Sequence, residues 1–191
     1  MSLQKLVETY IRKPLNGDEI HRLTGKPPIL YQDLKKFKRL EDLIGKQGYQ
    51  VILMQVSNKT DGHFVALGIN VIGNPYFFDP YGMSFIQVQQ LSTYDEKLPD
   101  FITPLLEDYA QRHNKQVERN KTDYQSKAGG VADCGRHSSL ACLLLRHLTF
   151  KELEELYFTN TDTWLKGDHV ATILTLLSLD DIGRFYINRG K

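Results

Sequence analysis

Two hydrophobic periodicities divide the chain into helical and β segments. Apolar residues spaced by three and four predict amphipathic helices over 3–12 and 32–44, with a short helical turn over 18–23. From Tyr49 the period changes, and runs rich in apolar and β-branched residues predict strands over 51–56, 63–71 and 76–78. The first two runs do not alternate with polar residues, which is typical of strands covered on both faces.

Beyond these strands the helical period returns. It predicts helices over 101–112, 133–147, 150–157 and 169–179, the last with Asp168 as its N-cap, together with a short strand over 115–119 and a loop over 121–131. The order of helices, sheet core and helices predicts an α+β fold with a mostly antiparallel central sheet flanked by helices. A chain of 191 residues suits a single domain, residues 1–191.

Composition and charge remove several classes of function. The 24 Lys and Arg balance 23 Asp and Glu, so no general field attracts nucleic acid, which is left open only as an activator. The longest apolar run, 138–145, is far shorter than the roughly 20 residues that cross a bilayer, so no membrane association is expected. With two cysteines and no apolar N-terminal stretch, we expect a protein of a reducing compartment that is not secreted.

The chemistry is concentrated around Cys134, which a Gly-rich loop delivers to the start of a predicted apolar helix. Amide groups and the helix dipole stabilise a thiolate at such a position, and the thiolate is the nucleophilic form of cysteine. Cys142 lies about 12 Å further along the same helix. This exceeds the roughly 7 Å that a disulfide tolerates, so both thiols are expected to be free.

A base and an acid for this thiol lie in the predicted hairpin. His63 opens one strand and Asp79 closes the next, so an antiparallel pairing brings both to the same rim of the sheet. A turn centred on 72–73 would set Asp79 opposite Ala66 or Leu67, so direct contact with His63 requires an asymmetric turn or a bulge. Gln125, in the loop before Cys134, is the candidate side-chain donor of an oxyanion hole, together with the backbone N–H of Cys134.

Other interpretations of these residues stay open. Cys134 alone could be a small buried hydrophobe, and Asp79 could initiate a turn before Pro80. Asp61 and Asn58 are reserve orienting groups, and His137, one helical turn beyond Cys134, is a competing base. A zinc site is also conceivable, although its residues lack C-x-x-C or H-x-x-x-H spacing; they are His63, Asp133, Cys134 and His137.

Three segments carry a resemblance to a known family. Gly62 to Leu67, Tyr76 to Gly82 and Asp133 to Gly135 are similar to the adenain-type cysteine proteases, a family that includes viral maturation proteases and SUMO-specific proteases. The second segment is the most specific, because it places an acidic residue, Pro, an aromatic residue and Gly after the histidine strand. The likeness is strongest over 50–147 and is nearest in style to virophage proteases of the mavirus type.

The resemblance implies a papain-like, adenain-like fold and a Cys–His–Asp triad. It implies that Cys134 is the nucleophile, His63 the base, Asp79 the orienting acid and Gln125 the oxyanion donor. Phe64 stands where these proteases usually carry tryptophan and is expected in the substrate cleft. Adenovirus protease is activated by a disulfide-bound peptide and by DNA, but this chain has only Cys142 to spare and no strong basic excess, so these cofactors are not expected. No metal is expected either.

The implied activity is cleavage of viral capsid and other structural proteins during virion maturation, in the virion and the host cytoplasm. Two enzymatic alternatives use the same triad: a ubiquitin- or SUMO-specific protease, and an acyltransferase. A third alternative is a non-catalytic interaction module that retains the fold.

Overall fold

The computed structural model describes residues 3–55, 62–91, 98–127, 132–158 and 167–179, which form a mixed α+β structure. Its helical elements up to residue 47 are α1 (Leu3–Ile11), α2 (Gly17–Thr24), the 3-10 turns η1 (Tyr31–Lys36) and η2 (Gly45–Gln47), and α3 (Leu40–Ile44). Those after the first strands are α4 (Phe85–Leu91), α5 (Ile102–His113), α6 (Cys134–Leu144), α7 (Phe150–Phe158) and α8 (Gly167–Ser178).

Five strands form one sheet in the order β1-β2-β3-β4-β5. Its centre is the antiparallel set β2 (Tyr49–Gln55), β3 (Gly62–Ile69) and β4 (Pro75–Phe78), and the parallel edge strands are β1 (Ile29–Leu30) and β5 (Glu118–Arg119). The central strands are almost wholly buried, as their lack of alternation predicted. The mostly antiparallel sheet is therefore confirmed.

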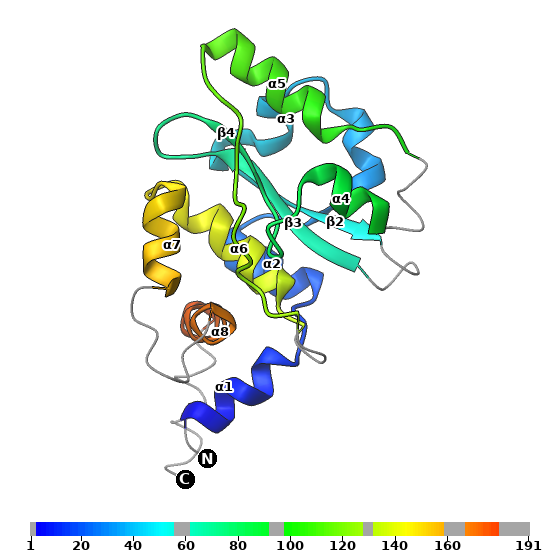
Figure 1. The fold of residues 1–191 in the computed structure, drawn as a ribbon. Helices are drawn as coiled ribbons and strands as arrows, with labels where there is room; N and C mark the ends of the chain where they lie inside the picture. Colours follow the sequence, from blue (N-terminus) through cyan, green and yellow to red (C-terminus); the bar gives the residue numbers. More distant parts are fainter. Residues whose placement is uncertain (1–2, 56–61, 92–97, 128–131, 159–166, 180–191) are drawn as a thin grey trace.

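The sheet separates two hydrophobic clusters, because successive side chains of each strand point to opposite faces. Ala66 and Phe78 face a cluster that includes residues of α2, α6, α7 and α8, whereas Val65 and Phe77 face one formed with α3, α4 and α5. Figure 1 shows this layering, with α6 against the sheet and α8 beyond it. The helix that begins at Cys134 thus packs directly on the strand that begins near His63.

The predicted helix over 32–44 is interrupted. Phe37 and Arg39 adopt extended backbone between η1 and α3. Leu34 and Leu40 nevertheless reach the same buried cluster, so the apolar spacing predicted burial correctly and continuity wrongly. Lys26 donates to the carbonyl oxygens of residues 43, 44 and 49 at 2.9–3.3 Å, which stabilises the early end of α3 from a distant part of the chain.

Three short elements, β1, η2 and α4, were not predicted, and one helix start was assigned incorrectly. β1 is only two residues long, and α4 begins at a reciprocal pair of hydrogen bonds between Ser84 and Gln87, a capping-box signal that the sequence does contain. Asp168 is not an N-cap: it lies inside the first turn of α8, and its carboxylate bonds to other segments.

Candidate active site

The β3–β4 hairpin brings His63 and Asp79 into contact. Its register runs without a bulge from the Ile69–Pro75 pair to the Ala66–Phe78 pair, so Asp79 continues the line opposite Val65. His63 lies two residues from Val65 and on the same face, and such diagonal neighbours are within side-chain reach. The Asp79 carboxylate is hydrogen-bonded to Nε2 of His63.

The predicted alignment of Asp79 with Ala66 or Leu67 is therefore wrong. The loop between the strands is longer than a centred two-residue turn: the N–H of Asn70 donates to the carbonyl of Asn74 at 2.9 Å, and the Asn70 side chain accepts from the N–H groups of Ile72 and Asn74. This Asx-type loop moves the register so that neither an asymmetric pairing nor a bulge is needed.

Asp79 is held in a fully buried position by its own turn. Its Oδ2 accepts hydrogen bonds from the backbone N–H groups of Tyr81 at 3.0 Å and Met83 at 2.9 Å, which leaves Oδ1 for the histidine. The turn requires glycine at position 82, where φ is +68° and a Cβ would lie 2.7 Å from the Lys121 carbonyl oxygen. The Asp-Pro-Tyr-Gly sequence thus forms a rigid carboxylate holder.

Two residues that sequence reasoning did not assign complete this holder. The Asn120 side chain accepts from the Asp79 N–H at 2.9 Å and donates to the Asp79 carbonyl. The Tyr81 ring stacks on the His63 ring, with centroids 5.2 Å apart and planes 18° apart. The position of Asn120 directly after β5 could have identified it. β5 pairs with β4 in parallel, so the residue after β5 lies beside Asp79, the residue after β4.

Cys134 is the first residue of α6 and is half-buried. The next residue, Gly135, packs closely: a Cβ there would lie 3.3 Å from side-chain atoms of both Ile20 and Phe64, which would have to shift by a few tenths of an ångström. The Ser138 hydroxyl donates to the Phe64 carbonyl at 2.8 Å, which fixes α6 against β3. The helix start is thereby brought to the same rim as His63.

Phe64 contributes to this junction through both backbone and ring. Its ring is partly buried against the α6 side of the core, and its backbone forms a hydrogen bond with the Cys134 thiol. These contacts place Phe64 next to Cys134. Its role in a substrate cleft stays a prediction.

Electrostatics in the site favour a charge-separated pair. Burial alone would lower the pKa of His63, but hydrogen bonds to Asp79 and Cys134, and the charges of those groups, raise this pKa from 6.5 to about 9. Burial alone would raise the pKa of Cys134, but its hydrogen bond to His63 and the His63 charge lower that pKa below the ordinary value. Because Nε2 of His63 bonds to Asp79, Nδ1 is the ring nitrogen left for the thiol.

Gln125 lies in the loop after β5 and is 98% buried, at 2% exposure. The N–H groups of Tyr124 and Gln125 both donate to the Pro80 carbonyl, at 2.8 and 3.0 Å, so this loop is joined to the residue that follows Asp79. Gln125 is therefore not an exposed loop glutamine. Its assignment as an oxyanion donor stays a prediction.

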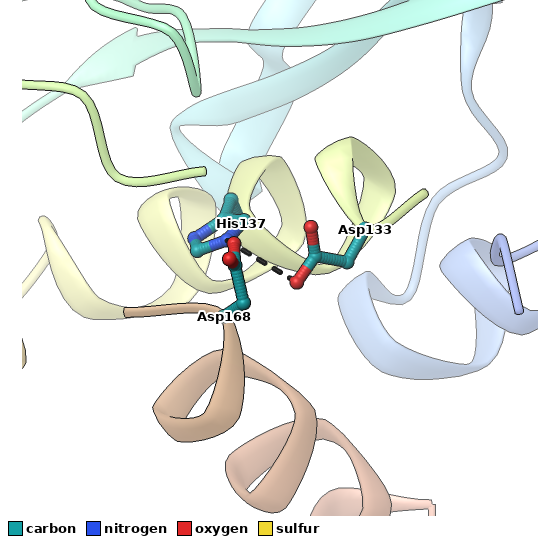
Figure 2. Close-up of side chains that lie close together, drawn as sticks. All are labelled: Asp133, His137 and Asp168. Carbon is teal, nitrogen blue, oxygen red and sulfur yellow. Dashed lines mark hydrogen bonds and ion pairs between the residues drawn. The ribbon is translucent and has the colours of Figure 1, made fainter. Parts of the chain in front are cut away.

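A second buried constellation lies at the start of α6. His137 Nε2 is 3.1 Å from Oδ1 of Asp168 and 3.4 Å from Oδ2 of Asp133, and the three side chains converge from α6 and α8 (Figure 2). Burial alone would lower the pKa of His137, but the two carboxylates raise it to about 9. His137 thus pairs with these carboxylates while His63 pairs with Cys134.

The zinc set considered from the sequence is not assembled as written. Its members divide between the two constellations, with His63 and Cys134 in one and Asp133 and His137 in the other. The reserve orienting groups, Asn58 and Asp61, lie outside the described residues.

Comparison with known proteins gives one informative likeness. The chain is 26% identical over 170 residues to the uncharacterized protein V9 of Sputnik virophage, an alignment that covers 84% of this chain and 93% of V9. No family model matches the chain, and no solved structure matches it. A relation to a virophage protein is therefore supported, and the papain-like fold and the protease family stay predictions.

None of the described helices is both long and apolar enough to cross a bilayer.

Proposed function

We propose that this protein is a cysteine endopeptidase of papain-like, adenain-like architecture. The observation that carries the proposal is the continuous series of contacts from Asp79 to His63 to Cys134, in which the pKa of the imidazole is raised and that of the thiol is lowered. A buried aspartate that orients a histidine toward a cysteine at a helix start has the geometry of nucleophilic acyl transfer.

In the proposed reaction, the Cys134 thiolate attacks the carbonyl carbon of a peptide bond. The backbone N–H of Cys134 and the Gln125 side chain receive the oxyanion, and the His63 imidazolium donates its proton to the leaving amine. The resulting thioester is hydrolysed by a water molecule that neutral His63 deprotonates. Asp79 holds the ring through both steps, and its carboxylate stabilises the imidazolium form.

We further propose that the substrates are viral capsid or other structural proteins, cleaved during maturation in the virion or the host cytoplasm. The similarity to a virophage protein supports a viral setting. This part of the proposal rests on that similarity and on the resemblance to viral maturation proteases. The site uses no cofactor in this mechanism.

The test is a comparison of the wild-type protein with Cys134→Ser on a peptide library made from a digested proteome. New N-termini are read by mass spectrometry. The Cys134→Ser variant is the control, because serine preserves the shape of the site. We expect new N-termini with the wild type alone. Absence of cleavage, combined with transfer of label from an acyl-CoA donor to amines, would contradict the peptidase and favour the acyltransferase.

A further inference from the structure

The first turn of α8 holds the backbone on both sides of Gln125. The N–H of Ser126 lies 3.1 Å from each carboxylate oxygen of Asp168. On the other side of Gln125, the Tyr124 carbonyl oxygen is so close to Gly167 that a Cβ there would lie 2.5 Å from it. Residue 124 thus contacts Gly167 and residue 126 bonds to Asp168, so two consecutive residues of α8 hold the backbone on either side of Gln125.

Asp168 also reaches the helix that carries the nucleophile. The same Oδ1 that receives the Ser126 N–H is 3.1 Å from Nε2 of His137, one helical turn after Cys134. The His137 ring extends this link to Asp133, the residue before Cys134 (Figure 2). Asp168 therefore joins the Gln125 loop to both sides of the α6 start.

We propose that Asp168 is a positioning residue, and that with Gly167 it makes the first turn of α8 a built-in element that places the Gln125 loop against Cys134. This inference rests on the proposed function, because it assigns to α8 the arrangement of the two oxyanion donors. Pro80 holds the same loop independently, because its carbonyl oxygen accepts from the N–H groups of Tyr124 and Gln125. The turn that carries Asp79 and the first turn of α8 thus both contact the backbone of the Gln125 loop.

The same three side chains could also be considered as metal ligands, since their donor atoms lie within 4.8 Å of one another. A histidine that ligates a metal almost always donates its other ring N–H to a carboxylate or carbonyl oxygen. Nδ1 of His137 is buried, and among the described residues it has no hydrogen-bond partner. Nε2 instead faces two carboxylates, as a ring nitrogen that carries a proton does. We therefore infer that the proton on Nε2 of His137, and not a metal ion, links the carboxylates of Asp133 and Asp168.

The experiment separates thiolate formation from acyl transfer. Alkylation of Cys134 by iodoacetamide requires the thiolate but develops no oxyanion. In acylation by p-nitrophenyl acetate, Cys134 Sγ forms a thioester, p-nitrophenolate leaves, and an oxyanion develops on the way. We expect Asp168→Asn to lower the acylation rate about tenfold to a hundredfold, because small displacements of an oxyanion donor have effects of this size. Its alkylation rate should stay within about twofold of wild type.

Thr172→Val is the matched control. Thr172 is buried one turn further along α8, its hydroxyl has no hydrogen-bond partner among the described residues, and valine preserves its shape. Both rates should remain at the wild-type value in this variant. Gly167→Ala, which moves the same turn without changing charge, should reproduce the selective loss of acylation.

Each other outcome overturns the inference. Equal loss of both rates in Asp168→Asn would show a general structural role, and unchanged rates would show no role. If EDTA reproduced the defect in wild type and zinc reversed it, the three side chains would be a metal site. If wild type were acylated no faster than Cys134→Ser, the proposed function itself would fail. If the wild type released p-nitrophenolate faster than Cys134→Ser, and Asp168→Asn released it at the wild-type rate, the inference alone would be rejected.

Discussion

Replacement of Asp79 by asparagine tests the electrostatic basis of the site. The pKa of His63 rises from 6.5 to about 9, which corresponds to about 3 kcal/mol in favour of the imidazolium. The hydrogen bond to Asp79 comes first among the contributions that raise it, followed by that to Cys134. We therefore expect Asp79→Asn to lower the His63 pKa to about 8 or below.

The substitution should also change the tautomer of His63. The asparagine oxygen can accept the two backbone N–H groups that now bond to Oδ2, of Tyr81 and Met83, and its amide group then faces Nε2. Nε2 must become an acceptor, so the proton of the neutral ring moves to Nδ1. Since Nδ1 is the nitrogen that serves the thiol, peptidase activity should fall by about a thousandfold or more.

Histidine labelled with carbon-13 at Cε1 allows the titration to be followed by NMR. The chain has six histidines, and His63→Gln assigns the signal. Asp33→Asn is a control, because the Asp33 carboxylate pairs with Lys36 at the surface. A wild-type His63 that titrates near pH 6.5, or a titration unchanged by Asp79→Asn, would refute this reasoning.

Three further predictions concern the scaffold. Gly62→Ala should lower the free energy of unfolding in urea by about 2 kcal/mol, because its Cβ would lie 2.1 Å from a Leu53 methyl carbon and 2.8 Å from the Met54 carbonyl oxygen. Gly17→Ala is the control and should be near neutral, because its nearest contact would be an ordinary 3.6 Å. Equal effects of the two substitutions would contradict this reasoning. Asn120→Ala should lower turnover about tenfold or more by loosening the backbone of Asp79, and unchanged turnover would exclude that support. The free energy of unfolding should fall as pH rises from 6.5 to 9, because the folded state holds the His137 proton more tightly than the unfolded state; the stabilisation is complete below pH 6.5 and lost as pH passes 9. The pair of His63 and Cys134 adds little slope, since a proton that moves from the thiol to the imidazole leaves the number of bound protons unchanged. A His137→Asn variant with the wild-type slope would argue against this origin.

The strands and the rim of the sheet could be predicted because their signal is local. Unbroken apolar runs gave β2, β3 and β4, and the order of His63 and Asp79 on adjacent antiparallel strands placed both at one end. The start of α6 at Cys134 followed from the glycines before it and the apolar run after it. The expected contact of His63 with Asp79 is observed, and their roles as base and orienting acid stay predictions.

The parts that could not be predicted depend on contacts between distant segments. The loop closed by Asn70 moved the register by a residue, and Lys26 stabilises the end of α3 from 17 residues away. Asp168 has the local sequence of an N-cap, but its partners, Ser126 and His137, lie 42 and 31 residues away. No periodicity within a short window contains such information.

The rate of alkylation at Cys134 as a function of pH tests the central claim most directly, because it needs no substrate. Mass spectrometry reads Cys134 and Cys142 in one sample; burial raises the pKa of Cys142, which is fully buried and should stay unreactive in the folded protein. We predict that Cys134 is fully reactive by about pH 6, whereas an ordinary thiol requires a pH near 8.5, and that His63→Ala removes most of the difference. Slow alkylation of Cys134 with the pH dependence of an ordinary thiol, unaffected by His63→Ala, would contradict the thiolate–imidazolium pair and the proposed peptidase.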